Sequence, residues 1–597
     1  MFMMILDSLL KQALALVFAG LCVGQLWAQA DDWRTRFELS DSTETVTYHE
    51  GIAYLERLAA ASERIQLQTY GNTDAGFPLH LAVVSTSGVF DSQALRAQGK
   101  AVFLVNNAIH PGEPDGVDAS LLLLREIAFS DRLDKVLHNT VLIIIPFYNI
   151  GGALNRNSTT RVNQDGPLAY GFRGNANNLD LNRDFIKMDS ENAFAFVKIF
   201  QTWQPDLYLE NHVTNGADYQ HIMTLLATQE DKLGAPLGAY MRQKFSPTLD
   251  DAMRQAGFPA VPYVNVYNRP PDDGYNQFFD SPRYSSGYAA LFHTPGYVAE
   301  THMLKPYRQR VIATLALMKT LLQILQTEGA ALQQQRKAQA IAYRQASQAA
   351  LRWQHDPNQY RLIPFDGYEA TRIPSKVTTG DRLFYDRSKP YSREVKFFDH
   401  YQTAVQTDKP WAYVIPASRR KVWKRLQANG VQLQQLTEAV MLEAEVSYIE
   451  SFETLKSPFE GHYLHYNTSI RRQTESLTIP AGDYVALVDQ ASQRFLLEVL
   501  EPEAHDSYFN WNFFDEILQQ KEGYSAYVFE DIAANLLAED QALKQAFEAQ
   551  KAQDADFAQN PAAQLDFIYK RSPYYEKAHL RYPVLRLPKQ VLLPFQP

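Results

Sequence analysis

Apolar runs and apolar-periodic segments alternate through the first half of the chain. Val102 to Val105 and Thr140 to Pro146 are continuous runs with the length and β-branched character of strands buried on both faces. Val117 to Ile127, Phe194 to Trp203 and Arg308 to Leu325 have the spacing of helices that bury one face. Strands that alternate with helices predict an α/β fold with a mixed, mostly parallel, doubly wound sheet flanked by helices.

Shorter strands are predicted around this central pattern. Ile65 to Tyr70 and Leu79 to Val84 alternate like the two strands of a hairpin. Asp206 to His212 and Tyr297 to Glu300 also have strand-like patterns. Between residues 155 and 180 the chain is rich in Asn, Gly, Arg and Ser, which predicts a long loop of the kind that functional sites use.

The second half of the chain has a different pattern of predicted elements. Residues 330–353 are rich in Ala and Gln and predict a helical connector. Trp411 to Ile415, a helix from Ala417 to Asn429 and Val431 to Leu433 resemble a small βαβ unit, within an accessory domain that is smaller and either α+β or β-rich. The predicted organisation is therefore a leader, a first domain, a connector and an accessory domain of unknown role, at residues 1–30, 31–329, 330–353 and 354–597.

The first thirty residues have the features of a signal peptide. Ala13 to Val23 is an apolar run, and Ala28-Gln29-Ala30 is a small-x-small cleavage site. A membrane anchor is the alternative, but the run is short for a span of about 20 residues. We therefore expect cleavage after Ala30, no membrane span in the mature protein, and export to a bacterial periplasm or exterior.

Composition limits the range of possible functions further. The 597 residues are too many for one hydrophobic core, and 46% hydrophobic with 21% charged residues is ordinary for a globular protein. The formal net charge of −10 argues against a nucleic-acid partner, because such proteins need a basic surface. The single cysteine, Cys22, lies in the leader, so a metal site in the mature chain must use His and carboxylate ligands.

A candidate metal-binding turn follows the apolar run at 102–105. His110 and Glu113 flank Pro111-Gly112, a pair that forces a tight turn and lets an imidazole and a carboxylate converge. The turn comes directly after a predicted strand, at the sheet edge where open α/β sheets bind ligands. A catalytic zinc takes three protein ligands, and this pair supplies two nitrogen and carboxylate donors of the required type.

Three further stretches complete a pattern of motifs. They are Arg173 followed by Asp180-Leu181-Asn182-Arg183, the predicted strand that ends in His212, and Gly296-Tyr297-Val298-Ala299-Glu300. In this order, and with His212 placed 99 residues after Glu113 (212 − 113), the motifs resemble those of the zinc carboxypeptidase family, the metallopeptidases that remove C-terminal residues. The resemblance covers about residues 45 to 325.

The resemblance implies a role for each motif residue. His110, Glu113 and His212 would bind one zinc ion per chain, and Glu300 would be the general base on zinc-bound water. Arg173 would stabilise the oxyanion together with zinc, while Asn182 and Arg183 would hold the terminal carboxylate of the substrate. Asp180 would fix the tautomer of His110, and Tyr284 would close over the substrate. These residues are His110, Glu113, Arg173, Asp180, Asn182, Arg183, His212, Tyr284 and Glu300.

Some choices remain open at this level. Tyr288 and Tyr275 are alternatives to Tyr284, Arg283 could add charge to the pocket, and His302 could support it. Tyr148 to Gly152 and Asp184 depart from the family pattern, which leaves the substrate open and keeps the reaction class.

The sequence therefore predicts an exported zinc-dependent metallocarboxypeptidase whose substrates are peptides with a free C-terminal carboxylate. One alternative is a zinc amidase or deacylase acting on cell-wall peptides or acyl amino acids. The other is a catalytically inactive peptide- or glycan-binding protein. Side-chain preference and oligomeric state cannot be predicted.

Overall fold

The computed structural model of the chain describes residues 33–595, and the predicted signal peptide lies outside them. The described chain forms two compact units. Unit 1 comprises residues 33–408, 425–431 and 489–498, and unit 2 comprises residues 409–424, 432–488 and 499–595. No helix within residues 33–595 is both long enough and apolar enough to cross a membrane.

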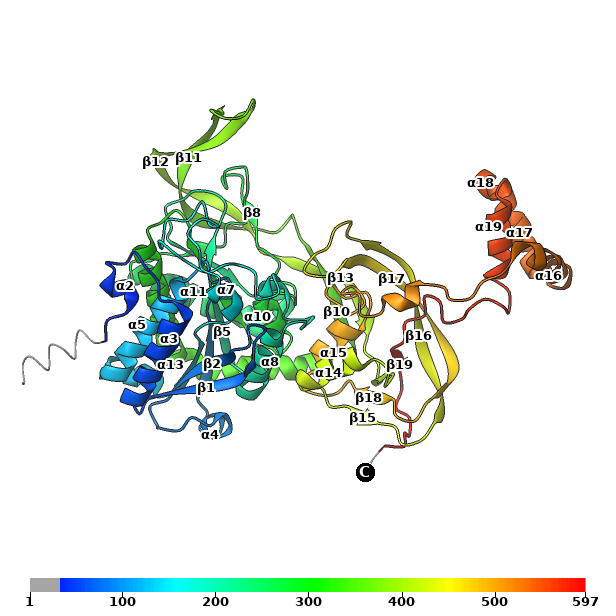
Figure 1. Cartoon of the computed structure of the whole chain (residues 1–597), viewed down its shortest axis with the longest axis horizontal. Coiled ribbons are helices and arrows are strands. Elements are labelled where there is room, and N and C mark those ends of the chain that lie inside the picture. The colour runs from blue at the N-terminus through cyan, green and yellow to red at the C-terminus, as the bar shows by residue number, and fades with distance from the viewer. Residues whose placement is uncertain (1–32, 596–597) are drawn as a thin grey trace, which may run out of the picture. The chain divides into compact units, whose positions relative to one another are not determined.

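Unit 1 is built on an eight-stranded mixed sheet (Figure 1). Its strand order is β1-β2-β4-β3-β5-β9-β6-β7. Strands β4, β3, β5 and β9 are parallel, whereas β1, β2 and β4 pair antiparallel, as do β9 and β6. The predicted fold class is confirmed, with strands at β1 (Ile65–Asn72), β2 (Pro78–Val84), β3 (Ala101–Asn106), β4 (Thr140–Ile145), β5 (Leu207–Thr214), β6 (Met223–Ala227), β7 (Val261–Pro262) and β9 (Gly296–His302).

The central strands show why the sheet forms. Every residue of β3 and β4 is buried, and their Val, Ile and Leu side chains fill both faces of the parallel sheet. Strand β5 is equally buried but carries Glu210 and His212 on one face, opposite Leu207 and Leu209. Buried polar groups need hydrogen-bond partners, so we expect the polar side chains on this face to form a hydrogen-bonded site.

Helices cover both faces of the sheet. Leu207 and Leu209 pack in the core formed with α5 (Asp115–Phe129) and α13 (Tyr307–Gln345), beside α3 (Tyr48–Ala61). The opposite face meets α8 (Glu191–Trp203) and α12 (Ser285–Ala290), where Tyr208 contacts Phe196 edge-on. Shorter helices are α2 (Arg36–Leu39), α4 (Ser92–Ala97), α6 (Asp134–Leu137), α7 (Ile150–Leu154), α9 (Glu230–Leu233), α10 (Ala235–Tyr240) and α11 (Ser246–Gln255).

Helix α13 extends beyond the predicted Arg308–Leu325 segment and ends at Gln345. Residues 348–353 of the predicted helical connector belong instead to strand β10 (Gln348–His355), which pairs with β13 (Tyr401–Asp408). The Ala- and Gln-rich sequence contains no helix breaker before Gln345, so the periodic helix simply continues.

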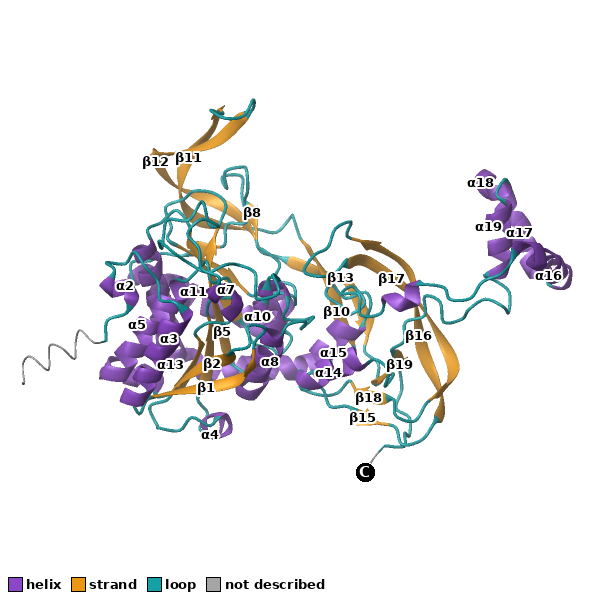
Figure 2. Cartoon of the chain, viewed as in Figure 1, coloured by secondary structure: helices purple, strands orange, loops and turns teal. Residues whose placement is uncertain are grey.

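Unit 1 also contains a long β-hairpin, formed by β11 (Arg361–Pro374) and β12 (Asp381–Phe398) (Figure 2). The base of the hairpin pairs with β8 (Tyr275–Asn276) and packs Phe365 and Phe397 into a small core. Tyr219 bridges to Gly367 of the hairpin. These contacts attach the hairpin to the segment that follows β5.

Unit 2 contains a six-stranded sheet in the order β15-β18-β14-β19-β16-β17. Strand β18 lies antiparallel between β14 and β15, so the predicted βαβ unit has an inserted strand, and its last strand is Gln434–Gln435 rather than Val431 to Leu433. The further elements of unit 2 are β14 (Ala412–Ile415), β16 (Val440–Thr454), β17 (His465–Ile479), β18 (Tyr484–Leu487), α16 (Ala526–Glu539), α17 (Gln541–Gln553), α18 (Ala555–Ala558), α19 (Pro561–Tyr569) and β19 (Leu585–Leu587). Helices α14 (Arg420–Ala428) and α15 (Gln493–Leu500) each belong partly to unit 1.

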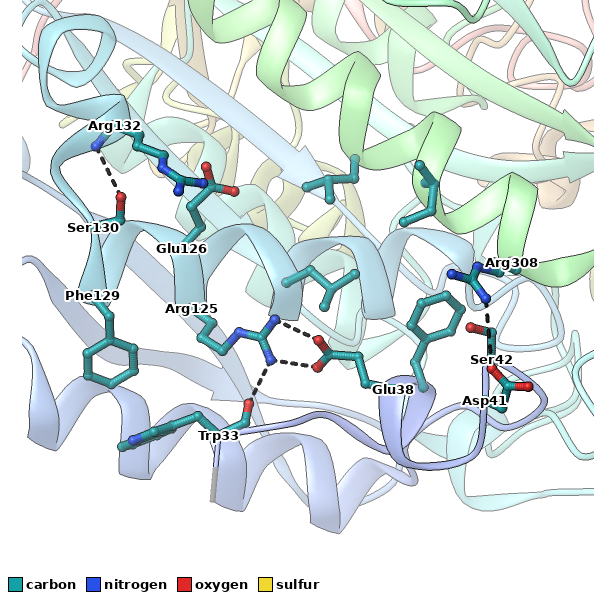
Figure 3. Close-up of a pocket in the computed structure, with 14 residues that line it drawn as sticks. Trp33, Glu38, Asp41, Ser42, Arg125, Glu126, Phe129, Ser130, Arg132 and Arg308 are labelled. Carbon is teal, nitrogen blue, oxygen red and sulfur yellow. Dashed lines mark hydrogen bonds and ion pairs between the residues drawn. The ribbon is translucent and has the colours of Figure 1, made fainter. Parts of the chain in front are cut away.

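A surface cavity of about 900 Å³ lies among α2, α5 and α13 of unit 1 (Figure 3). Its wall contains the Arg125–Glu38 ion pair, in which Arg125 also donates to the carbonyl of Trp33. These contacts attach α2 to α5. None of the predicted metal or substrate residues lines this cavity.

Candidate active site

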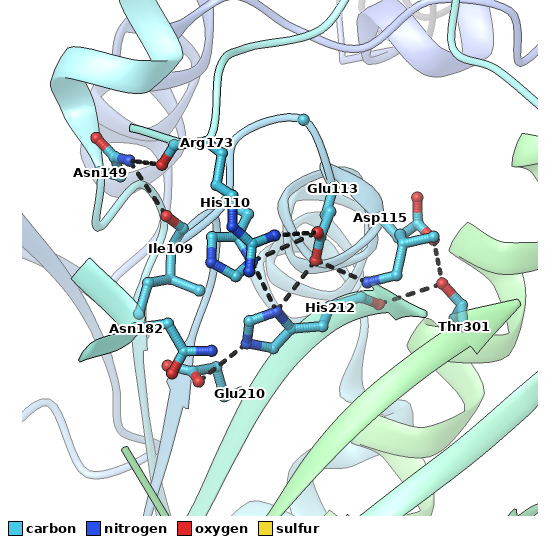
Figure 4. Close-up of polar contacts among 12 residues, drawn as sticks. Ile109, His110, Glu113, Asp115, Asn149, Arg173, Asn182, Glu210, His212 and Thr301 are labelled. Carbon is cyan, nitrogen blue, oxygen red and sulfur yellow. Dashed lines mark hydrogen bonds and ion pairs between the residues drawn. The ribbon is translucent and has the colours of Figure 1, made fainter. Parts of the chain in front are cut away.

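Three candidate metal ligands meet at one edge of the sheet of unit 1. His110 and Glu113 follow β3, and His212 lies in β5, the parallel neighbour of β3 (Figure 4). One ligand atom from each residue lies within 4.8 Å of the others, and all three side chains are buried. The structure therefore brings together residues that are up to 102 positions apart in the sequence.

The turn between the first two ligands forms as predicted. The backbone N–H of Glu113 donates to the carbonyl of His110 at 2.8 Å and closes the turn. A Cβ on Gly112 would lie 2.6 Å from Cδ of Arg161, so this glycine leaves room for the arginine side chain. The turn thus positions His110 and Glu113, and it leaves room for the side chain of Arg161 beside them.

The two imidazoles are oriented by carboxylates. Nε2 of His110 lies 2.9 Å from Asp180 Oδ1, and Nε2 of His212 lies 3.0 Å from Glu210 Oε2. Their Nδ1 atoms face each other at 3.1 Å. Lone pairs this close repel unless a proton or cation lies between them, so the two nitrogens and the Glu113 carboxylate fit a zinc ion.

Electrostatics also favour a cation here. Burial lowers the pKa of His212, but hydrogen bonds to Glu113 and Glu210 outweigh that effect and raise it to about 10. The site around these nitrogens therefore attracts positive charge, because the nearby carboxylates are removed from water.

Glu113 is fixed by four neighbours. One carboxylate oxygen accepts from the backbone N–H of Val213 at 2.9 Å and lies 3.0 Å from Nδ1 of His212. The other accepts from Nη1 of Arg161 at 2.8 Å and lies 3.4 Å from Nδ1 of His110. Burial raises the pKa of Glu113, but Arg161 and His110 more than offset this, so it stays well below the usual value.

Sequence reasoning did not single out Arg161. The residue lies in the predicted loop of residues 155–180, where nothing in the local pattern distinguishes it from other arginines. Its guanidinium also reaches the carbonyl of Val213 at 3.4 Å, and its Nε donates to Gln164 at 2.5 Å. Arg161 thus joins the loop to the ends of both ligand-bearing segments.

Glu300 lies beside His212 because of strand register. The two residues are Cα partners on the parallel strands β5 and β9, so their side chains project from the same face. Burial raises the pKa of Glu300, His212 opposes the shift and Glu113 adds to it, with a resulting value of about 7. A carboxylate with this pKa is suited to proton transfer near neutral pH.

A second group of candidate residues lies on the loop that precedes and follows Asp180. The Asp180 carboxylate accepts from Nε of Arg173 at 3.0 Å and from the backbone N–H of Asn182 at 2.9 Å. Nη1 of Arg183 lies 3.8 Å from the same carboxylate. Burial raises the pKa of Asp180, but His110, Arg173 and Arg183 outweigh it and hold the pKa far below its usual value.

Two of these side chains have capacity for a ligand. Oδ1 of Asn182 is buried, and no hydrogen-bond partner for it lies within the described chain. The Arg173 side chain is 44% exposed and its Nη1 lies 3.7 Å from Glu113, so it stands at the opening beside the metal ligands.

The three candidate tyrosines occupy different surroundings. Tyr284 directly precedes α12, and its ring lies under the guanidinium of Arg183 at 4.7 Å. Tyr288 is buried and donates to Asn429 at 2.7 Å, and Tyr275 is buried and donates to the carbonyl of Pro262. Only Tyr284 among the three lies against the loop arginines.

Other open choices are also placed by the structure. Burial lowers the pKa of His302 to about 3, and its ring packs against that of Tyr219 with 4.2 Å between the ring centroids. Asp184 is buried against Lys187 and Ser190. Asn149, which was predicted only as part of the departing stretch Tyr148 to Gly152, donates to the carbonyls of Ile109 and Arg173 at 3.2 and 2.9 Å and links the ligand turn to the loop.

A buried group of two histidines and one glutamate, at the carboxyl edge of a mixed α/β sheet, defines a mononuclear metallohydrolase site. Residues 52–216 match the model of the zinc carboxypeptidase family. This match and the buried group of His110, Glu113 and His212 support the predicted resemblance, the predicted enzyme class and the predicted zinc cofactor.

Individual relatives are distant. Carboxypeptidase 2 of Trichophyton tonsurans is 21% identical over 423 residues, which cover 68% of this chain and 72% of that protein. Carboxypeptidase 2 of Trichophyton rubrum is 21% identical over 492 residues, covering 79% and 84%.

Solved structures to which part of this chain is similar include a metallo-carboxypeptidase from Burkholderia cenocepacia, at 15% identity, a TM-score of 0.35, and coverage of 47% of this chain and 70% of that one. Carboxypeptidase A from Helicoverpa armigera is 15% identical, with a TM-score of 0.36 and coverage of 49% and 74%.

Proposed function

We propose that this protein is a metallocarboxypeptidase that hydrolyses the C-terminal peptide bond of peptides. His110, Glu113 and His212 would hold the zinc ion through two imidazole nitrogens and a carboxylate. When bound, zinc polarises a carbonyl and lowers the pKa of water, which is the chemistry that amide hydrolysis requires. The observation that carries the proposal is Glu300, which lies in register with His212 on the neighbouring parallel strand.

Glu300 would act as the general base. Its carboxylate would accept a proton from the attacking water and later transfer it to the leaving amine, as acid–base catalysis requires. The position on β9 supports this role, because the side chain shares a face with His212 and is partly buried. The pKa of about 7 allows the group both to accept and to release a proton.

Arg173 would stabilise the oxyanion that forms during attack. Its guanidinium is held by Asp180 at Nε, which leaves its outer nitrogens directed to the side of Glu113. A preoriented cation at the developing charge is the type of interaction that contributes most to such reactions.

Asn182 and Arg183 would bind the terminal carboxylate, with Tyr284 closing over it. A carboxylate only accepts hydrogen bonds, so Asn182 would contribute the N–H groups of its Nδ2 atom. Arg183 donates to the carbonyl of Asn182 at 2.7 Å and stacks on Tyr284, so its planar guanidinium is already oriented. A planar guanidinium can bind a carboxylate through two parallel hydrogen bonds.

A mass-spectrometric time course on a mixed pool of synthetic peptides would test the proposal. We expect stepwise loss of single C-terminal residues, abolished by a zinc chelator and restored by zinc. The same pool with C-terminal amides serves as the control, because it removes the anion that Arg183 would bind.

Different results would point elsewhere. Intact peptides together with cleavage of acyl amino acids or cell-wall peptides would replace the proposal with an amidase or deacylase. Absence of bound zinc and of any turnover would favour a binding protein without catalysis.

We further propose that the protein acts outside the cytoplasm after removal of residues 1–30. The proposal rests on the apolar run and the small-x-small site of the sequence. N-terminal sequencing of the protein from culture fractions would test it, with Asp31 expected as the first residue. An intact N-terminus in a cytoplasmic fraction would contradict it.

A further inference from the structure

Glu210 is a buried carboxylate to which four donors converge. It is 1% exposed. Its Oε2 lies 3.0 Å from Nε2 of His212 and accepts from the hydroxyl of Ser285 at 2.7 Å. Its Oε1 accepts from the hydroxyl of Tyr208 at 2.8 Å and from Nδ2 of Asn106 at 2.9 Å. Every lone-pair direction of the carboxylate is therefore used, and no water is needed to complete the site.

The arrangement follows from strand geometry. Tyr208, Glu210 and His212 alternate onto one face of β5, so neighbours two residues apart can hydrogen-bond along the strand. Asn106 is the last residue of the parallel neighbour β3, and Ser285 begins α12. The carboxylate is thus held by three separate elements, and an ionised group in such surroundings is fixed in place.

We infer that Glu210 is a positioning residue that orients His212 and fixes its proton on Nε2, so that Nδ1 is free to bind the metal. The inference rests on the proposed zinc site. Metal-binding histidines commonly donate their second ring N–H to a carboxylate, and loss of such a partner weakens metal binding about 10- to 100-fold. Asp180 makes the equivalent contact to His110. Glu210, in contrast, is fully buried on a strand of the sheet.

The chemistry of the four donors makes an amide a poor substitute. Glu210→Gln has the same shape but only one acceptor oxygen and a new NH₂ group. If the oxygen faces His212, the NH₂ group faces the NH₂ of Asn106, and two donors meet. If the NH₂ group faces His212, the imidazole must accept at Nε2 and carry its proton on Nδ1, which blocks the metal position.

The test is zinc affinity, measured by competition with a chromophoric chelator on the full-length mature protein. For Glu210→Gln we expect a zinc Kd about 10- to 100-fold above that of the wild type. Ser285→Ala, which removes one donor but leaves the contact to His212, should change the Kd less than about threefold. The visible spectrum of the cobalt-substituted Glu210→Gln protein should also differ from wild type, because the ligand nitrogen is reoriented.

Asp118→Asn is the matched control for burial. Asp118 is also a buried carboxylate of unit 1, but its side chain bonds to Tyr307 and contacts no metal ligand. This variant should keep the wild-type zinc Kd and cobalt spectrum, whatever its effect on the melting temperature.

The zinc measurement distinguishes failure of the role of Glu210 from failure of the proposed function. If wild type binds zinc and Glu210→Gln binds it equally tightly, the role of Glu210 is overturned while the proposed function stands. If wild type binds no zinc, the proposed function itself fails. Should Glu210→Gln not fold, NMR of ¹⁵N-histidine-labelled, zinc-loaded wild type decides: a ring proton on Nε2 of His212 supports the inference, and one on Nδ1 overturns it.

Discussion

The two halves of the site are built in different ways. His212 and Glu300 lie on neighbouring strands, where sheet register fixes their separation and Glu210 completes the polar face. Arg173 and Arg183 lie on a loop, where side-chain hydrogen bonds around Asp180 determine their positions. The strand half is buried between helices, and the loop half is open, with Arg173 44% exposed.

This difference corresponds to two chemical tasks. A metal and its general base require a fixed geometry, which a sheet supplies because moving one strand would disturb the whole ladder. A substrate must enter and leave, which suits groups whose positions depend on a few replaceable hydrogen bonds. The comparison predicts large effects on catalysis or on metal binding in the strand half, and graded effects on catalysis and substrate binding in the loop half.

The largest effect is expected for Glu300→Gln. Loss of the general base should lower kcat about 10²- to 10⁴-fold, because general acid–base groups contribute effects of this size. Zinc stoichiometry and the melting temperature should stay near wild type, since the substitution keeps shape and strand pairing. Steady-state kinetics with metal analysis checks this, and near-normal turnover by the zinc-loaded variant would refute the role of Glu300.

Arg173→Ala should have the next largest effect. Removal of a preorganised oxyanion donor lowers kcat about 10²- to 10³-fold. Because Arg173 also bonds to Asp180, a smaller loss of zinc affinity should accompany it, which has no counterpart in Glu300→Gln. Arg173→Lys keeps the positive charge but not the planar guanidinium. Comparing it with Arg173→Ala therefore separates the effect of the charge from the effect of the geometry. Full recovery of Arg173→Ala by excess zinc would show that the residue only supports the metal.

Much of this fold could be predicted from the sequence because its central strands are continuously apolar. Val102 to Val105 and Thr140 to Ile145 allow no other placement than the middle of a parallel sheet. The end of α13 and the position of β15 were predicted less well. Neither depends on a local breaker or pattern: β15 is set by pairing with β18, some 50 residues later in the chain.

The residues of the site also differ in how well they could be predicted from the sequence. Motif spacing predicted that His110, Glu113, His212 and Glu300 belong to one site, and the structure brings these residues together, while their roles stay predictions. The roles of Arg161, Asn149 and Glu210 were not predicted. Each role depends on partners that lie on other segments of the chain. Alternation along β5 did place Glu210 on the face of His212, and a charged residue on a buried strand was the one available signal.

Arg183→Ala should weaken substrate binding more than it slows chemistry. Loss of charged hydrogen bonds to the terminal carboxylate, each worth about 1.5–3 kcal/mol, should raise KM about 10- to 100-fold. Zinc affinity should be unchanged, because Arg183 lies 3.8 Å from Asp180 and contacts no ligand. Peptide acids and peptide amides should be compared. If wild type cleaves both equally well, the assigned carboxylate contact is wrong.

The smallest effect concerns Asp250, a partly buried carboxylate without the hydrogen bonds that Glu210 receives. Asp250 lies in α11, where burial, opposed by Arg361 and Arg254, raises its pKa to about 6. The unfolded chain releases this proton near pH 4, so wild-type stability should fall as the pH rises from about 4 to about 6 and then level off. Asp250→Asn should remove that loss.

At pH 8, Asp250→Asn should therefore be about 1–2 kcal/mol more stable than wild type, and about equal to it near pH 4. Urea unfolding of unit 1 at both pH values would measure the difference. Asp251→Asn is the control, because the neighbouring side chain is 69% exposed and pairs only loosely with Arg254 at 3.4 Å. Equal stabilisation by both variants would show that net charge, and not the burial of Asp250, is responsible. A difference confined to Asp250 would show that its partial removal from water, without hydrogen bonds in place of the water, is the cause.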